Sequence, residues 1–242
     1  MQSLIALITG GNKGIGFATA RQLAQQGAHV VIAARDAGLG EAAAASLVAE
    51  GLSAESVVLD VTDQATIDTA AKAVELRHGR LDVLVNNAGV MRDAFDKKPS
   101  DQDLGMWRDT FDTNLFGVVA VTKAFLPLLR QSAAGRIVNV SSILGSMAAN
   151  VDPTSAFYDF KIPAYNISKT ALNAWTVHLA YELRDTNIKV NAAHPGFVKT
   201  ALHGVDAPMA ADEGAATSVM LAMVGSEGPT GSFFHGSDVQ PW

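Results

Sequence analysis

Short apolar and β-branched runs alternate along the chain with longer segments in which apolar residues recur every three to four positions. The short runs predict strands at residues 4–9, 29–34, 56–59, 83–85, 136–140 and 189–192. The longer segments predict helices at residues 17–26, 41–50, 64–77, 107–130 and 164–184. This regular alternation is typical of an α/β fold, a doubly wound parallel sheet that carries helices on both faces.

Two stretches, 145–163 and 194–213, show no clear periodicity. Each follows a predicted strand, so each is expected outside the carboxyl ends of the sheet, where open α/β folds bind their ligands. These two loops are our candidates for the wall that faces a substrate.

The composition fits one compact domain spanning residues 1–242. Apolar residues make up 48% of the chain and charged residues only 17%, which supplies a large core. With 18 basic and 24 acidic residues the net charge is −6, and no basic stripe indicates nucleic-acid binding. Cysteine is absent, which excludes disulfides and thiolate metal sites, and we predict no metal.

The N-terminal region enters an apolar run at residues 4–8 without a basic leader. No segment is expected to approach the run of about 20 apolar residues that a membrane helix needs. We therefore expect a soluble cytoplasmic protein that does not bind membranes.

A glycine-rich turn separates the first strand from the first helix. Its residues after Thr9 include Gly10, Asn12, Lys13, Gly14, Ile15 and Gly16. Glycine lets the backbone approach a pyrophosphate closely, and a helix N-terminus offers free N–H groups. The spacing differs from the G-x-G-x-x-G fingerprint, and a turn without a ligand is the alternative. The strand before it and the helix after it favour phosphate binding.

The end of the second strand indicates which nicotinamide cofactor would fit. An NAD site usually places an acidic residue there, against the ribose 2′-hydroxyl. This chain has Arg35, whose planar guanidinium can bind a 2′-phosphate, and Lys13 adds a second positive charge. Two solvated surface cations are the alternative, and Asp36 argues against a phosphate. We predict NADP(H).

Tyr165 and Lys169 begin a predicted helix four residues apart, so their side chains share one face. A lysine ammonium beside a phenol lowers the phenol pKa from about 10, which suits the phenol to proton exchange with a substrate oxygen. Such a pair is common on helix surfaces, so its weight depends on its surroundings. Tyr158 and Lys161 form a similar pair, but at a spacing of three and with no helical pattern after them.

Polar residues elsewhere in the chain supply those surroundings. The strand at 136–140 ends in Ser141 and Ser142, whose hydroxyls can donate to a carbonyl oxygen. Asn114 lies among apolar residues of a predicted helix, and residues 86–89 close the fourth strand with the sequence Asn-Asn-Ala-Gly. A strand-end cap, a helix-bending asparagine and an ordinary turn are the structural alternatives.

Taken in order, these motifs resemble those of the short-chain dehydrogenase/reductase superfamily over nearly the whole chain. The matching positions are 9–16, 60–61, 86–89, Asn114, Ser142, Tyr165 with Lys169, and 195–200. The resemblance implies a Rossmann-type sheet, with a cofactor-binding half at about 1–140 and a catalytic and substrate-binding half at about 141–242.

The resemblance also implies a role for each catalytic position. Tyr165 would transfer the proton, and Lys169 would bind the nicotinamide ribose and lower the tyrosine pKa. Ser142, chosen over Ser141 because the second position matches the family serine, would polarise the substrate carbonyl. Asn114 would hold a water relay behind the lysine.

Further positions are implied for the cofactor and the substrate. Asp60 and Val61 resemble an adenine-contacting pair. The expected groove around the nicotinamide and the phosphates is formed by Asn87, Ala88, Gly89, Pro195, Gly196, Val198 and Thr200. The expected substrate contacts are Ser142, Leu144, Tyr165 and Phe197.

The chain is most similar to the NADPH-dependent carbonyl reductases of this superfamily, which implies reversible reduction of a ketone or aldehyde to an alcohol. The alternatives are an NAD-linked alcohol dehydrogenase, an oxoacyl thioester reductase, and a non-catalytic regulator that senses NADP(H). The resemblance further implies a homodimer or homotetramer formed through the helices at 107–130 and 164–184.

Overall fold

A computed structural model describes residues 3–199 and 207–242 as a mostly parallel sheet in the order β3-β2-β1-β4-β5-β6-β7-β8. Strands β1 to β7 are parallel to their neighbours, and β8 runs antiparallel to β7. The strands are β1 Ile5–Thr9, β2 His29–Ala34, β3 Ala54–Val58, β4 Val83–Asn86, β5 Arg136–Val140, β6 Lys189–Ala193, β7 Phe233–His235 and β8 Asp238–Val239.

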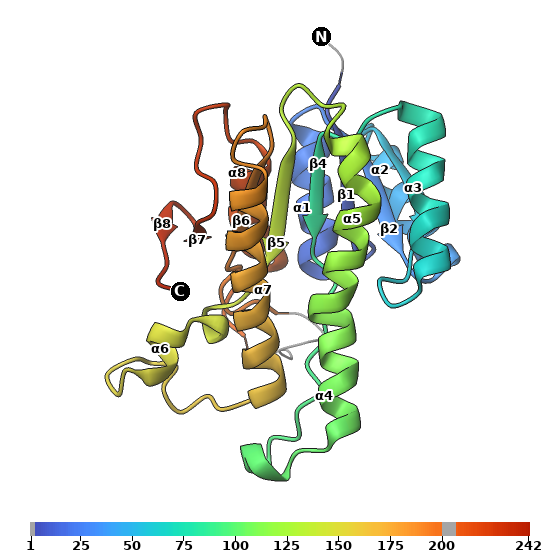
Figure 1. Cartoon of the computed structure of the whole chain (residues 1–242). Helices are drawn as coiled ribbons and strands as arrows, with labels where there is room; N and C mark the ends of the chain where they lie inside the picture. The colour runs from blue at the N-terminus through green and yellow to red at the C-terminus, as the bar shows by residue number, and fades with distance from the viewer. Residues whose placement is uncertain (1–2, 200–206) are drawn as a thin grey trace.

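Helices fill the connections between the parallel strands (Figure 1). The α-helices are α1 Gly14–Gln25, α2 Ala37–Ala49, α3 Gln64–His78, α4 Leu104–Phe111, α5 Gly117–Leu129, α6 Met147–Val151, α7 Pro163–Glu182 and α8 Ala211–Ala222. Short 3₁₀ turns are η1 Pro99–Asp101 and η3 Ile143–Gly145, and a π-helical turn, η2 Asp112–Phe116, joins α4 to α5.

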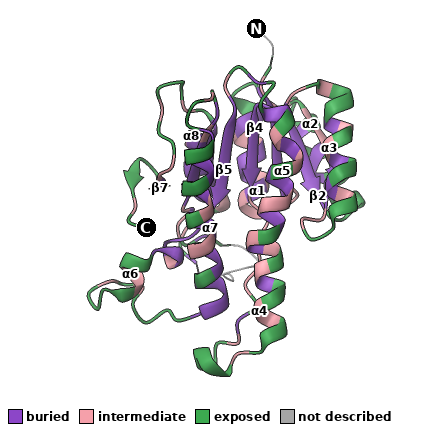
Figure 2. Cartoon of the chain, in the orientation of Figure 1, coloured by how far each residue is buried: buried purple, intermediate pink, exposed green. Residues whose placement is uncertain are grey.

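The two faces of the sheet are buried under separate groups of helices because side chains alternate along each strand. In β1, Ile5 and Leu7 pack with α3, α5 and α7, whereas Ala6 and Ile8 pack with α1, α2 and α8. Figure 2 shows buried strands in the centre and helices whose exposed residues face outward. The expected doubly wound α/β fold is thus confirmed, with β8 as an antiparallel addition.

The C-terminal elements were not predicted, for two physical reasons. Strands β7 and β8 contain three and two residues, too few to show an alternating pattern. Helix α8 buries Gly214, Ala215, Thr217 and Ser218 as well as its larger apolar residues, so it lacks a polar face with helical period.

The predicted helix at 107–130 is longer than expected and is interrupted by η2. Within the described parts of the chain, the segment Leu104–Leu129 is long and apolar enough to cross a membrane, with a mean hydropathy of 1.3, so the expectation that no segment approaches this composition is wrong. Its apolar character has a second explanation, because Val121, Phe125 and Leu129 are fully buried against the sheet.

The strand order reverses between β1 and β4, because β2 lies on one side of β1 and β4 on the other. In open α/β sheets this switch point, at the carboxyl ends of the strands, is where a crevice for ligands forms. The glycine turn follows β1 and the Asn-Asn-Ala-Gly segment follows β4, so both lie at this edge of the sheet.

Candidate active site

Four predicted polar residues meet at the carboxyl edge of the sheet although they come from three parts of the chain. Ser142 follows β5, Tyr165 and Lys169 lie in the first two turns of α7, and Asn114 lies in η2. All four are at most 7% exposed. Because buried polar groups are costly unless paired, the partners of each one indicate what it can do.

The Tyr165 phenol lies beside Ser142, and their side chains are hydrogen-bonded. Burial raises the pKa of Tyr165 to about 12, and the hydrogen bond with Ser142 acts in the opposite direction. The net shift is therefore upward, opposite to the one expected from Lys169, because desolvation of the phenolate dominates. At neutral pH the phenol carries its proton and can act as an acid.

Lys169 is buried with its Nζ atom 5.7 Å from the centre of the Tyr165 ring. The ammonium donates a hydrogen bond of 2.8 Å to the backbone carbonyl of Val140, and burial lowers the lysine pKa to about 8. A Cβ atom on Gly89 would lie 3.5 Å from this Nζ and 3.4 Å from Oδ1 of Asn114. Position 89 thus lies within van der Waals reach of both side chains.

Asn114 uses its side chain to hold neighbouring segments together. Its Oδ1 accepts from the backbone N–H of Val90 at 2.8 Å, and its Nδ2 donates to the Val90 carbonyl at 2.8 Å and to Ser168 Oγ at 3.0 Å. The amide therefore ties the segment after β4 to α7. Because the Asn114 side chain already makes these bonds, a water relay at this position would have to use the backbone of η2. Turns of this π-helical kind are often found at functional sites.

Ser141 and Ser142 face different surroundings. Ser141 Oγ donates to Asn173 Oδ1 at 2.6 Å inside the core, so its hydroxyl is already used. Ser142 is bonded to Tyr165 and also accepts from the backbone N–H of Leu144 at 3.2 Å. The geometry favours Ser142, as the sequence predicts.

Asp93 is a site residue that sequence reasoning missed. Helix α7 begins at Pro163, which has no N–H, and the next two backbone N–H groups, of Ala164 and Tyr165, donate to the Asp93 carboxylate at 2.8 and 3.1 Å. The residue before the helix, Ile162, has no side-chain acceptor. Two features of the sequence could have indicated this contact: α7 has no capping residue of its own, and an acid follows the Asn-Asn-Ala-Gly motif.

Replacing Asp93 with Ala should lower the free energy of unfolding by about 1–3 kcal/mol, because two buried N–H groups lose their acceptor. Asp103→Ala is the matched control, since Asp103 is exposed and caps α4 through one N–H, of Met106, at 3.1 Å. Urea unfolding followed by circular dichroism measures both losses. Equal losses of unfolding free energy in the two variants would contradict the role of Asp93 as the cap of α7.

The glycine turn is fastened to the segment after β4. Asn87 Nδ2 donates to the Thr9 carbonyl at 2.8 Å, and Thr9 Oγ1 accepts from the backbone N–H groups of Asn87 and Ala88 at 2.9 and 3.0 Å. A Cβ atom on Gly16 would overlap Asn87 Nδ2. Only glycine lets α1 start this close to the fourth strand.

The start of α1 is suited to an anion. Gly10 and Gly14 have φ values of 61° and 55°, in the region that favours glycine. Lys13 makes no side-chain capping bond to any described residue, and no acidic residue lies in the first turn. The helix N-terminus, which includes Ile15 and follows Asn12, can therefore direct its N–H groups to a phosphate.

Arg35 lies beside this turn, because β2 pairs with β1 and the backbone N–H of Gly11 donates to the Ala33 carbonyl. Its side chain is exposed. Asp36, the residue that argued against a phosphate, uses its Oδ1 to accept from Leu39 N at 2.8 Å and thereby caps α2. The acid has a structural role, whereas Arg35 is exposed directly after the carboxyl end of β2.

Asp60 and Val61 follow β3 at the same edge. The Asp60 carboxylate accepts from the backbone and hydroxyl of Thr62 at 2.9 and 2.7 Å, which fixes the turn. The Val61 carbonyl lies so near Gly117 that a Cβ there would be 2.7 Å away. Both residues thus border the crevice where an adenine is expected.

A cavity of about 600 Å³ lies between the two loops that we expected to face a substrate, and Ile143, the residue after Ser142 in the chain, is part of its wall. Its lining residues are Ile143, Ala148, Ala149, Asp152, Ser155, Phe157, His194, Gly196, Phe197, Met209, His235, Gln240 and Pro241. Phe197, a predicted substrate contact, is part of this wall. Leu144, another predicted contact, packs on the small cluster around Phe233, as the cavity residues Ala149 and Phe157 also do.

The segment after β6 is only partly as expected. Gly196, with a φ of 86°, lines the cavity after Pro195, but the Val198 side chain is fully buried, close to Gly214. Val198 can reach a cofactor only through its backbone, which pairs with Met209. Thr200 lies outside the described residues.

Comparisons with known proteins agree with this arrangement. A family model described as short chain dehydrogenase matches residues 4–210. The chain is 40% identical to the short-chain dehydrogenase anuI of Penicillium roqueforti over 92% of this chain and 89% of that protein. It is 34% identical to carbonyl reductase (NADPH) 1 of Mus musculus, with 98% of both covered. The crystal structure of NADPH-bound carbonyl reductase from chicken fatty liver superposes with a TM-score of 0.86 at 27% identity, covering 100% of both chains.

Proposed function

Because the chain belongs to the short-chain dehydrogenase family, we propose that it is an NADPH-dependent reductase of small ketones or aldehydes. Family membership itself makes the chain an oxidoreductase that acts on carbonyl or alcohol groups with NAD(P)H. The single observation that supports a proton-transfer role is the buried Tyr165 phenol, which lies beside Ser142 and Lys169 at the carboxyl edge of the sheet. The reverse reaction, alcohol oxidation, uses the same groups.

The proposed mechanism uses Ser142 and Tyr165 together. The bound nicotinamide supplies a hydride to the carbonyl carbon. Ser142 and Tyr165 hydrogen-bond the carbonyl oxygen, which stabilises the negative charge that develops there. Tyr165 then gives its phenolic proton to that oxygen, and an alcohol leaves. An alkoxide is a stronger base than a phenolate, so a phenol with a pKa of about 12 is still an adequate acid.

Lys169 and Asn114 support this proton transfer. The Lys169 ammonium favours the phenolate that Tyr165 becomes, and it also lies beside Gly89, where the ribose would bind. Asn114 holds Val90 and Ser168 in place through the hydrogen bonds of its side-chain amide. We propose that a water chain beside η2 returns the proton to Tyr165.

The pH dependence of reduction should follow Lys169. The protonated lysine is the active form and its pKa is about 8, so kcat/KM should be level below pH 8 and about tenfold lower at pH 9 than at pH 7. Initial rates of NADPH oxidation at a saturating cofactor concentration measure this profile. A level profile up to pH 10 would contradict the role given to Lys169.

Unfolding of the protein at high pH would not explain the expected fall in kcat/KM between pH 7 and pH 9. Between pH 8 and the ordinary lysine value of 10.5 the unfolded chain holds more protons at position 169 than the folded chain does. The free energy of unfolding therefore gains a term that rises with pH through this window. Circular dichroism at each pH separates the two effects.

NADPH is favoured over NADH by the charges around the glycine turn. Arg35 and Lys13 offer two cations for a 2′-phosphate, and the carboxylate of Asp36 is turned to its own helix. The mouse relative is named for NADPH, and the chicken structure contains it. Further proposed cofactor contacts are Gly10, Asn87, Ala88, Gly89, Asp60, Val61, Pro195, Gly196 and Thr200.

The cavity between the two loops favours a small, mainly apolar carbonyl compound, because Phe157 and Phe197 form part of its wall while His194 and His235 add polar edges. A screen of NADPH oxidation over aldehydes, aryl ketones, cyclic ketones and α-keto esters tests this proposal. Turnover of acyl thioesters alone would favour an oxoacyl reductase, and turnover of alcohols with NAD alone an alcohol dehydrogenase. Absence of any turnover would favour a cofactor-sensing protein.

We also propose a homodimer or homotetramer formed through η2, α5 and α7. Apolar side chains are exposed along these elements, among them Phe116 at 59%, Ile167 at 47% and Tyr181 at 68%. A monomer would leave this apolar surface in water. Light scattering coupled to gel filtration measures the mass, and the mass of one chain would contradict the proposal.

A further inference from the structure

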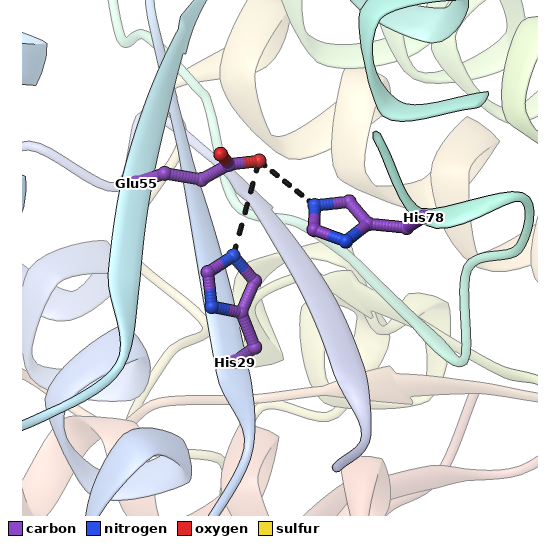
Figure 3. Close-up of side chains that lie close together, drawn as sticks. All are labelled: His29, Glu55 and His78. Carbon is purple, nitrogen blue, oxygen red and sulfur yellow. Dashed lines mark hydrogen bonds and ion pairs between the residues drawn. The ribbon is translucent and has the colours of Figure 1, made fainter. Parts of the chain in front are cut away.

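Two histidines and a glutamate meet at the edge of the sheet opposite the candidate active site (Figure 3). His29 is the first residue of β2, Glu55 is the second residue of β3, and His78 is the last residue of α3. In a parallel sheet the amino ends of the strands lie opposite the carboxyl ends, so none of these side chains can take part in the proposed hydride transfer.

The three side chains direct one ligand atom each to a common point. Nε2 of His78 is 2.9 Å and Nε2 of His29 is 3.8 Å from the same oxygen, Oε1 of Glu55, and the three ligand atoms all lie within 4.8 Å of one another. In a tetrahedral zinc site with bonds near 2.0–2.1 Å, neighbouring ligand atoms are about 3.4 Å apart. Small side-chain rotations would bring these atoms to that spacing.

The surrounding contacts prepare these atoms for a cation. His29 Nδ1 is 2.7 Å from Ser53 Oγ, so a proton on Nδ1 leaves Nε2 with a free lone pair. That Nε2 is buried and has no hydrogen-bond partner among the described residues. Arg77 Nη1 holds the other oxygen of Glu55 at 3.2 Å, which leaves Oε1 for the histidines.

The two imidazole rings lie side by side next to the Glu55 carboxylate. Their centroids are 5.0 Å apart, and their planes are inclined at 51°. A single ion between the rings and the carboxylate could therefore be reached by both histidines.

We propose that His29, Glu55 and His78 form a binding site for a divalent transition metal of the zinc type, which links β2, β3 and α3. Two imidazole nitrogens and one carboxylate oxygen suit zinc, and water would complete the tetrahedron. The absence of cysteine led us to predict no metal, but it excludes only thiolate sites. The proposed role is structural, because the site lies on the far edge of the sheet from Tyr165.

The test uses the full chain without an affinity tag, stripped of metal with a chelator and titrated with Zn²⁺ against a chromophoric indicator. We expect one Zn²⁺ per chain and a higher Tm with Zn²⁺ than without. In His78→Gln the affinity should fall by about tenfold or more and the Tm increase should disappear. His178→Gln is the matched control, because His178 is exposed on α7 outside the cluster, and its zinc binding should equal that of the unmodified chain.

Two further measurements keep the result decisive. Circular dichroism shows whether His78→Gln is folded, and His29→Gln serves as an independent second variant. Co²⁺ added to the unmodified chain should give the visible absorption bands of a four-coordinate site. If the unmodified chain takes up no Zn²⁺, or if both folded variants bind it as tightly as the control does, the proposal is overturned and the three residues form an ion-pair cluster only.

Discussion

Replacing Tyr165 with Phe should lower kcat for carbonyl reduction by about 10²–10⁴-fold and leave the affinity for NADPH nearly unchanged. The substitution removes only the hydroxyl that we assign to proton transfer and keeps the ring that fills a site 3% exposed. Cofactor contacts on the glycine turn and on Lys169 are untouched. Stopped-flow or steady-state rates give kcat, and quenching of tryptophan fluorescence gives the Kd for NADPH.

The control for this variant is Tyr158→Phe. Tyr158 is the other tyrosine followed by a lysine, with Lys161 Nζ 4.6 Å from its ring centre, but it is 37% exposed on the loop before α7. Removing its hydroxyl should change kcat less than about twofold, since surface substitutions usually have small effects. If Tyr165→Phe retained turnover near that of Tyr158→Phe, Tyr165 would not be the proton donor.

Changing Arg35 to Asp should reverse the preference between the two nicotinamide cofactors. Loss of a charge-assisted pair with the 2′-phosphate costs about 1.5–3 kcal/mol, so kcat/KM with NADPH should fall by about 10- to 100-fold. The new carboxylate can accept from a ribose 2′-hydroxyl, and kcat/KM with NADH should rise. The ratio of the two kcat/KM values, measured with the same substrate, reports the change.

Arg108→Asp gives the same change of charge at an exposed position on α4, away from the glycine turn. The cofactor ratio should not change in this variant, which separates a local contact from the general field of the protein. An Arg35→Asp variant that kept the original preference for NADPH would show that another group, such as Lys13, recognises the phosphate.

The pattern of the chain was enough to predict the part of the fold that positions the site. Strands β2 and β5 begin and end where the sequence predicts. Each is a short, mostly buried run rich in β-branched residues, and it differs clearly from the neighbouring segments, whose apolar residues recur with a helical period. The order of strands needed the resemblance to a family, since periodicity does not say which strands are neighbours. A local pattern places only Tyr165 and Lys169 on one helix face, and the resemblance to a family was needed to add Ser142 to them.

Interactions between distant segments could not be predicted in this way. Asp93 caps a helix that starts 70 residues later, and nothing near Pro163 names its partner. The direction of the pKa shift of Tyr165 was wrong because an i, i+4 lysine is visible in the sequence, whereas the burial that dominates the shift is a property of the folded core. Leu144 was assigned to the substrate wall for its apolar character, which serves equally well in the cluster around Phe233.

The cavity proposed to bind the substrate is bounded mainly by two loops and the C-terminal residues, whereas the proposed proton-transfer residues lie on a strand end and a helix. Under the proposed function, reactivity and substrate choice belong to different parts of the chain. Exchange of residues 147–160 for a longer or shorter segment would reshape the cavity wall, while Tyr165 would keep the capping contacts of α7 with Asp93. Under the proposed function, libraries restricted to residues 147–160 are expected to vary the accepted ketone and its enantiomeric face at little cost to the chemical step, whereas changes at 195–200 would also touch proposed cofactor contacts.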